Sequence, residues 1–251
     1  MIELKNVCTC YGDKRVLDSL SATFEKGRLT AVIGANGCGK STLLKTAAGI
    51  MPPKSGEIFI DGDDLRSITR REAATRISYL SQGRDTPELT VAELVLHGRF
   101  PHLSYPRVYT ARDREIALRA IRAVGIEELA DKPLSILSGG MRQSAYVAMA
   151  LAADADHILL DEPTTYLDIG HQLALMRLLR SIADGGCAVA ALMHDLPLAL
   201  TYADAVWVMR NGALVMSGTP GEVCTSGVLH EVFGVDMIAD NGSYYCRLGR
   251  D

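Results

Sequence analysis

The stretch GANGCGKST, from Gly34 to Thr42, constrains this chain more than any other part of the sequence. It fits the pattern G-x-x-x-x-G-K-[ST], with an apolar run before it (LTAVIG, 29–34) and a helical pattern after it (STLLKTAAGI, 41–50). Glycines let such a loop curl around phosphates, and the following helix points free backbone N–H groups at them. The sequence therefore predicts a strand, a phosphate-binding loop and a helix in succession.

Every residue of this loop is a candidate nucleotide contact. Lys40 is expected to reach the β- and γ-phosphates, and the Ser41 hydroxyl is expected to hold Mg²⁺. The backbone amides of residues 37–42 are expected to point towards the phosphates. The candidate nucleotide-binding residues of the loop are Gly34, Ala35, Asn36, Gly37, Cys38, Gly39, Lys40, Ser41 and Thr42.

Two acidic residues follow another short apolar run, in HILLDEP (157–163). A buried strand that ends in paired acids suits Mg²⁺ coordination by the first acid, usually through water, and proton abstraction from an attacking water by the second. Asp161 is therefore the candidate metal ligand and Glu162 the candidate general base.

Short apolar runs alternate with helical patterns along the chain, which predicts an α/β fold with a largely parallel sheet. Asn211-Gly212, between two alternating runs, predicts a tight hairpin. From about residue 83 to residue 153 the helical patterns continue without a convincing strand between them. We expect a single domain with a core formed by about 1–82 and 154–251 and a helical subdomain at about 83–153. The connection GRFPHLSYPRVYT (98–110) is expected to be a surface loop.

A second glycine-rich segment, LSGGMR (137–142), also opens a helical pattern. Ser138 and the amides of Gly139 and Gly140 form a candidate anion site at the start of that helix. Taken alone, this segment favours an ordinary helix with a serine N-cap. Its occurrence in the same chain as GANGCGKST raises the question of why one nucleotide needs two loops.

Composition excludes several classes of protein. The net charge is −4 over 251 residues, so no broad basic field favours nucleic-acid binding. The longest charge-free runs, of about eleven residues, fall short of the roughly 20 apolar residues of a membrane-spanning helix. The N-terminus lacks the pattern of a secretory signal, and the six cysteines lack C-x-x-C spacing, so a cytosolic chain with reduced thiols is expected. None of the four asparagines begins the N-K-x-D pattern of GTPases, and small-molecule kinases have no need of LSGGMR.

The motifs taken together resemble the ATP-binding subunits of ABC transporters over nearly the whole chain. The order in this sequence is Tyr11, GANGCGKST, Ser81-Gln82, LSGGMRQ, HILLDEP, TYLD (165–168) and MHD around His194. The resemblance implies a P-loop NTPase core with an N-terminal antiparallel β part. It also implies a homodimer in which each ATP lies between GANGCGKST of one copy and LSGG of the other.

The resemblance also implies roles for individual residues outside the first loop. Gln82 would contact Mg²⁺ and the attacking water, and His194 would hydrogen-bond the γ-phosphate. Asp168 would cross the dimer interface, and Tyr11 would stack on adenine. Family members most often carry glutamine at the position of Met141, so a polar contact from there to the opposite nucleotide is in doubt.

Two further stretches, EPTTYLDIGHQ (162–172) and GRFPH (98–102), resemble subunits that serve iron-siderophore, haem or cobalamin uptake. This branch implies integral membrane permease subunits, indirect work with a periplasmic or surface substrate-binding protein, and a peripheral position on the cytoplasmic face of the membrane. His102 and His171 are interpreted as structural or interface residues. A chromosome-maintenance ATPase is disfavoured because Lys40 and Ser138 are only 98 residues apart (138 − 40). A soluble ATPase of the iron–sulfur assembly type stays open.

Overall fold

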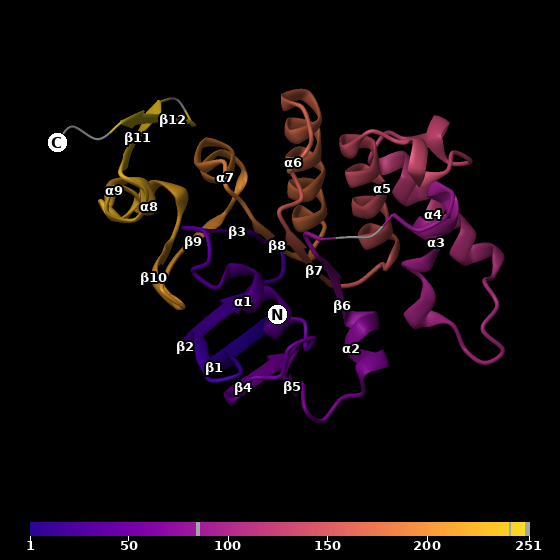
Figure 1. Cartoon of the computed structure of the whole chain (residues 1–251), viewed down its shortest axis with the longest axis horizontal. Helices are drawn as coiled ribbons and strands as arrows, with labels where there is room; N and C mark the ends of the chain where they lie inside the picture. Colours follow the sequence, from indigo (N-terminus) through magenta and orange to yellow (C-terminus); the bar gives the residue numbers. More distant parts are fainter. Residues whose placement is uncertain (84–85, 241, 249–251) are drawn as a thin grey trace.

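The computed structural model describes residues 1–83, 86–240 and 242–248. Within this part of the chain, strands form a four-stranded antiparallel sheet, a six-stranded sheet and a separate hairpin (Figure 1). The antiparallel sheet has the order β2-β1-β4-β5, formed by β1 (Ile2–Tyr11), β2 (Lys14–Phe24), β4 (Ser55–Ile60) and β5 (Asp63–Asp64). It confirms the expected N-terminal antiparallel part.

The six-stranded sheet has the order β10-β9-β3-β8-β7-β6, and only its β9–β10 pair is antiparallel. Its strands are β3 (Leu29–Gly34), β6 (Ile77–Leu80), β7 (His157–Asp161), β8 (Ala188–Leu192), β9 (Ala205–Arg210) and β10 (Ala213–Gly218). Parallel strands end at the same edge of a sheet. The loops that follow β3, β6, β7 and β8 therefore lie together, and these loops carry the candidate site residues.

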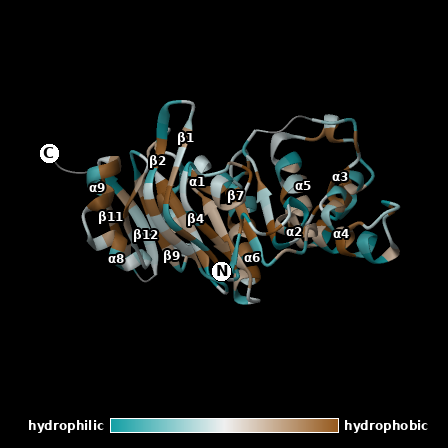
Figure 2. Ribbon diagram, turned by 90° about the horizontal axis from the view of Figure 1, so that it is seen from below, coloured by the Kyte–Doolittle hydropathy of each residue, from teal (hydrophilic) through white to brown (hydrophobic). Residues whose placement is uncertain are grey.

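Apolar side chains pack against both faces of this sheet. Every residue of β3, β7 and β8 is buried, as expected for parallel strands covered on both sides. Along β3, Ala31 and Ile33 point into one cluster and Val32 into the other, which follows from the two-residue period of a strand. Figure 2 shows hydrophobic residues along the central strands and alternating hydrophilic and hydrophobic residues on the helices.

Helices cover the two faces unequally. Helix α1 (Lys40–Ala47) packs between the two sheets in the smaller cluster. The larger cluster holds residues of α3, α4, α5, α6 and α7. The remaining helix bounds are α2 (Arg70–Arg76), α3 (Val91–His97), α4 (Ala111–Ala123), α5 (Gly139–Ala152), α6 (Ile169–Asp184), α7 (Leu196–Tyr202), α8 (Pro220–Thr225) and α9 (Val228–Phe233), with short 3₁₀ turns at Phe100–His102, Glu127–Leu129 and Leu134–Ile136.

The segment between β6 and β7 is helical, with α3, α4 and α5 packed on one another. The separation of this segment as a subdomain stays a prediction.

The connection at 98–110 is only partly the surface loop that we expected. Tyr105 is 96% exposed, but Arg99 is buried, and its guanidinium lies 3.1 Å from the Asp113 carboxylate and donates to the Ala152 carbonyl. Burial of an arginine here depends on an acceptor fourteen residues further along the chain, which composition does not reveal.

Two hairpins complete the C-terminal part. The predicted turn at Asn211-Gly212 joins β9 to β10, and both residues have positive φ (50° and 81°), as a two-residue type I′ turn requires. Strands β11 (Val235–Asp240) and β12 (Ser243–Leu248) form a second hairpin, which we did not predict.

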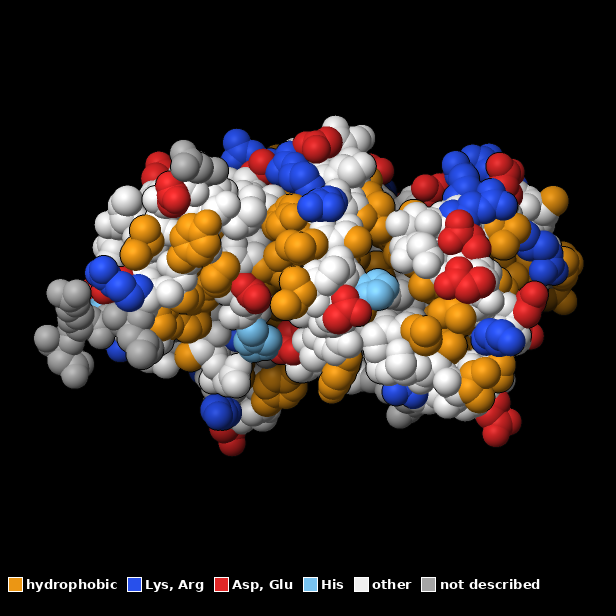
Figure 3. All heavy atoms as spheres, turned by 90° about the horizontal axis from the view of Figure 1, so that it is seen from above, with side chains coloured by type: hydrophobic (Ala, Val, Ile, Leu, Met, Phe, Trp, Pro, Cys, Tyr) orange, Lys and Arg blue, Asp and Glu red, His pale blue; other side chains and the backbone are white. Residues whose placement is uncertain are grey.

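No helix in the described ranges combines the length and apolar composition needed to cross a bilayer. On the face shown in Figure 3, charged side chains of both signs are interspersed with apolar patches.

Candidate nucleotide-binding site

The predicted phosphate-binding loop joins β3 directly to α1. Gly37 and Gly39 have φ of 75° and 106°, a region that side chains rarely adopt, so the curl of the loop depends on glycine at both positions. Helix α1 begins after Gly39 without a side-chain cap and without an acidic residue in its first turn. Its first backbone N–H groups therefore remain available to an anion.

Lys40 is buried inside this loop, with 6% of its surface exposed. Its Nζ donates hydrogen bonds to the carbonyls of Gly34 (2.7 Å) and Ala35 (3.1 Å). The ammonium thus lies within the loop, next to the backbone that would surround the phosphates. This placement agrees with the role expected for a P-loop lysine.

Asp161 lies at the end of β7 and is 2% exposed. The Ser41 hydroxyl donates to one of its carboxylate oxygens (3.2 Å), and the Tyr79 hydroxyl donates to the other (3.4 Å). Burial, the largest cause, raises the pKa of Asp161, and the neighbouring charge of Glu162 adds to the rise. A cation at this position would favour the ionised carboxylate.

Glu162 follows in a left-handed conformation, with φ of 53°. Non-glycine residues seldom adopt this conformation, and such strain gathers at functional sites. Its carboxylate receives the Gln82 amide (2.7 Å) and the Thr165 hydroxyl (3.2 Å) on Oε2, while His194 Nε2 lies 2.5 Å from Oε1. The structure thus brings together Gln82, Glu162 and His194, which come from three different loops.

These residues and the phosphate-binding loop border one hollow of about 610 Å³, large enough for a nucleotide. Tyr11 stands at its margin and is 51% exposed, as a residue that stacks on a base must be. The lining residues are Tyr11, Val16, Asn36, Gly37, Gly39, Lys40, Ser41, Thr42, Gln82, Glu162 and His194.

The LSGG segment lies at the start of α5, and none of its residues lines this hollow. Ser138 caps α5, and its hydroxyl accepts the Met141 amide at 3.3 Å. A Cβ on Gly140 would come within 3.0 Å of the Tyr166 carbonyl, so the backbone of residues 164–168 approaches this helix start closely. Tyr166 itself is 78% exposed and has φ of 69°.

Asp168 lies beside that helix start rather than beside Lys40. It caps α6, accepting the His171 amide at 2.9 Å, and its other oxygen is 2.8 Å from His171 Nδ1. A hollow of about 500 Å³ is lined by Ile126, Ser138, Gly139, Gly140, Met141, Ser144, Tyr166, Leu167, Asp168 and His171. It shares no lining residue with the hollow at Lys40. One chain therefore carries two separate candidate phosphate sites.

Gln143 connects the two sites, and we did not predict its role. It is 7% exposed in α5, and its amide donates to the carbonyls of Glu162 (3.2 Å) and Pro163 (2.8 Å). The LSGG helix thus holds the backbone that carries the candidate base. The sequence signal was limited to a glutamine two residues after Met141, with nothing to indicate its acceptors.

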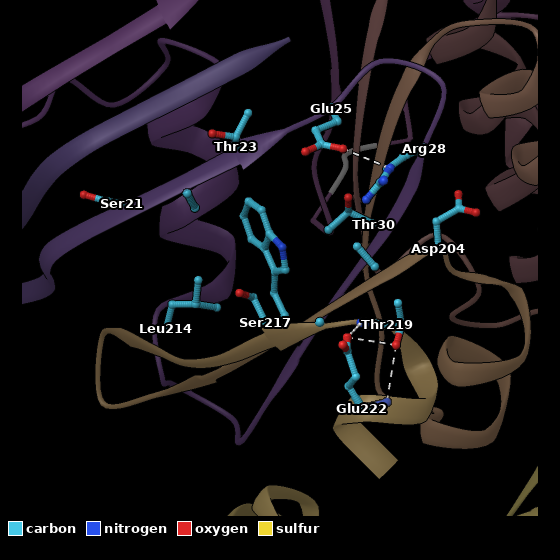
Figure 4. Close-up of a pocket in the computed structure, with 14 residues that line it drawn as sticks. Ser21, Thr23, Glu25, Arg28, Thr30, Asp204, Leu214, Ser217, Thr219 and Glu222 are labelled. Carbon is cyan, nitrogen blue, oxygen red and sulfur yellow. Dashed lines mark hydrogen bonds and ion pairs between the residues drawn. The ribbon is translucent and has the colours of Figure 1, made fainter. Parts of the chain in front are cut away.

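Another hollow, of about 360 Å³, lies between β2, β9, β10 and α8 (Figure 4). Figure 4 shows Glu25 paired with Arg28 and Glu222 hydrogen-bonded to Thr219. Asp204, also labelled there, accepts the backbone amide of Leu29 at 2.8 Å. The carboxylates of this hollow are therefore engaged in the fold, and none of the predicted site residues lines it.

Comparison with known proteins identifies the family of this chain. Residues 17–165 match the family described as ABC transporter. Ferric enterobactin transport ATP-binding protein FepC of Escherichia coli is 41% identical over 234 residues, covering 92% of this chain and 86% of the relative. Iron(3+)-hydroxamate import ATP-binding protein FhuC of Bacillus subtilis is 39% identical over 228 residues, covering 90% and 85%.

Solved structures show the same fold. The dimeric structure of MJ0796, a bacterial ABC transporter cassette, superposes with a TM-score of 0.79 at 26% identity, covering 88% of this chain and 99% of that one. The chain therefore belongs to the ABC transporter family, as a subunit that binds and hydrolyses ATP.

Proposed function

We propose that this chain is the ATPase of an importer that carries an iron-siderophore or a related metal chelate across the cytoplasmic membrane. The names of FepC and FhuC, which refer to ferric enterobactin and iron(3+)-hydroxamate, support this substrate class. Haem and cobalamin are the alternative cargoes. Cobalamin import ATP-binding protein BtuD of Halobacterium salinarum is 37% identical over 221 residues, although these cover only 55% of that relative.

The observation that carries the mechanism is the pair of hollows that share no lining residue. Each one presents a helix start with backbone N–H groups, and a nucleoside triphosphate has enough anionic oxygens to bind both. In the proposed homodimer, two copies pair head to tail, so that Ser138, Gly139 and Gly140 of one copy cover the nucleotide held by Lys40 of the other. The dimeric relative MJ0796 supports this arrangement. Asp168, beside Ser138, would lie at the same interface.

Magnesium fits the donor set at the end of β7. Ser41, Asp161 and Gln82 offer a hydroxyl, a carboxylate and an amide oxygen, and Mg²⁺ prefers such oxygen ligands together with water and phosphate. When bound, the ion would neutralise charge on the β- and γ-phosphates. Asp161 would take part through water.

The remaining site residues act on the nucleotide and on water. Glu162 would accept the proton of the attacking water, and its contacts to Gln82 and His194 hold it in place before the nucleotide arrives. His194 would then hydrogen-bond the γ-phosphate, while Gln82 orients the water. Tyr11 would stack on adenine.

A membrane permease is the proposed partner of a groove lined in part by Tyr79, three residues before Gln82. This groove, of about 650 Å³, lies between α2, the segment after α1, and β6, and its lining is mostly apolar. Tyr79 lines it and also donates to Asp161, so one side chain connects the groove to the candidate metal site. Docking there would hold the chain at the cytoplasmic face of the membrane, with a substrate-binding protein acting on the far side.

Two experiments test this function. The full chain, tagged and extracted from membranes in detergent, is expected to co-purify with a polytopic membrane protein, whereas capture of soluble iron–sulfur assembly factors alone would contradict the transport role.

Cells that carry the Glu162→Gln variant are expected to lose uptake of a ⁵⁵Fe-siderophore, while they retain uptake of cobalamin through a separate cobalamin importer. Loss of cobalamin uptake with normal iron uptake would instead assign the cobalamin alternative.

A further inference from the structure

The β11–β12 hairpin is not part of either large sheet, and within the described residues it pairs only with itself. Strand β12 lies along α7, while β11 lies against α8 and α9. Figure 1 shows this hairpin at the same end of the molecule as these helices, away from α3, α4 and α5. The hairpin therefore contributes to the packing of α7 rather than to the central sheet.

Helix α7 begins two residues after His194. Asp195, between them, is the N-cap and accepts the Leu198 amide at 2.8 Å, so the backbone that follows His194 is tied to the first turn of the helix. The His194 side chain is 45% exposed, and within the described part of the chain its ring contacts the Glu162 carboxylate. Its orientation therefore depends mainly on how β8 ends and how α7 begins.

Strand β12 contacts α7, and two of its residues are candidates for this contact. Tyr244 is half-buried and packs against the main apolar cluster, to which α7 contributes Leu196, Leu198, Ala199 and Leu200. Cys246 lies near Asp195: burial is the larger cause that raises the pKa of its thiol, and the Asp195 carboxylate adds to the rise. Its sulfur also contacts Met237 Sδ across the hairpin at 3.2 Å.

We propose that the β11–β12 hairpin positions His194 for hydrolysis by holding α7, and that Tyr244 is the main positioning residue. This inference rests on the proposed role of His194 at the γ-phosphate. None of the described hairpin residues, 235–240 and 242–248, lines the nucleotide hollow or the Ser138 hollow. Its effect must therefore be exerted on turnover and not on nucleotide binding, since displacing a catalytic group by about 1 Å can slow a reaction up to roughly a hundredfold.

Tyr244→Ala and Tyr245→Ala form a matched pair of variants for the test. The two tyrosines are adjacent, but Tyr245 is 54% exposed and serves as the control. In the full chain, Tyr244→Ala is expected to lower kcat for ATP hydrolysis about tenfold with less than a threefold change in KM. Tyr245→Ala is expected to match the wild type, and Tyr244→Phe is expected to restore kcat because it keeps the ring.

Combination with His194→Ala shows whether the hairpin acts through the histidine. If it does, adding Tyr244→Ala to His194→Ala lowers kcat no further, because coupled residues are not additive. Multiplying losses, or an effect confined to KM, would overturn the inference while leaving the role of His194 intact. Full turnover in His194→Ala alone would instead refute the proposed role of His194 at the γ-phosphate.

A charge variant decides the matter if Tyr244→Ala fails to fold. Cys246 is exposed, and Cys246→Asp would place a second carboxylate near Asp195, weakening the cap of α7. We expect it to lower kcat severalfold, with Cys246→Ser unchanged. Equal kcat for these two variants would overturn the proposal.

Discussion

Replacing Glu162 by glutamine tests the chemistry with little change in shape. Gln82 and Thr165 donate to Oε2 at 2.7 and 3.2 Å, and an amide oxygen in that position still accepts both hydrogen bonds. The amide NH₂ then faces His194 Nε2, which can accept in one tautomer. The change in stability should therefore stay near one hydrogen bond, about 1 kcal/mol, against a total of roughly 5–15 kcal/mol.

The catalytic loss should be much larger than this structural loss. A positioned general base contributes about 10²- to 10⁴-fold, or roughly 2.7–5.4 kcal/mol of barrier. Phosphate release at saturating Mg·ATP is the assay, with gel filtration to confirm that ATP-dependent pairing survives. Glu127→Gln, which alters an exposed acid that lines neither hollow, is the control. Turnover of Glu162→Gln within threefold of the wild type would refute the assignment of the base.

Three other predictions concern Ser138 in the second loop, the stacking of Tyr11 on adenine, and the buried His157. Ser138→Arg should abolish hydrolysis but leave ATP binding to a single chain intact, as measured by fluorescent nucleotide titration, since its hollow is separate from that of Lys40. Tyr11→Ala should raise the Kd for ATP about 5- to 150-fold by removing a stack of roughly 1–3 kcal/mol; an unchanged Kd would contradict the stack. His157 is fully buried, and burial lowers its pKa, so the unfolded chain binds its proton first and stability falls as pH drops below about 6.5. In His157→Gln the melting temperature should fall less steeply from pH 7 to pH 5, and parallel curves for the two proteins would contradict this.

The motifs could be recognised in the sequence because each is a local arrangement of backbone and side chain. A glycine loop between a strand and a helix specifies its own geometry, and the acids at the end of β7 follow from a short buried run. For the same reason the turn at Asn211-Gly212 was predictable, since both residues tolerate positive φ.

The hydrogen bonds that hold these motifs in place were not predictable, because their partners are distant in sequence. Tyr79 and Asp161 are 82 residues apart, and the acceptors of Gln143 are backbone carbonyls, which leave no trace in composition. The β11–β12 hairpin was missed because the burial of β11 does not alternate. Its first three residues, 235–237, are half-buried and its last three, 238–240, are exposed, so no two-residue period of apolar side chains marks the strand.

The carbonyls that hold Lys40 have a consequence for the catalytic cycle. A buried ammonium without acceptors would be strongly unfavourable, and the carbonyls of Gly34 and Ala35 satisfy it. In the proposed cycle, an anion bound to this loop would exchange one set of oxygen acceptors of Lys40 for another. Release of the product would then require no unfolding of the loop.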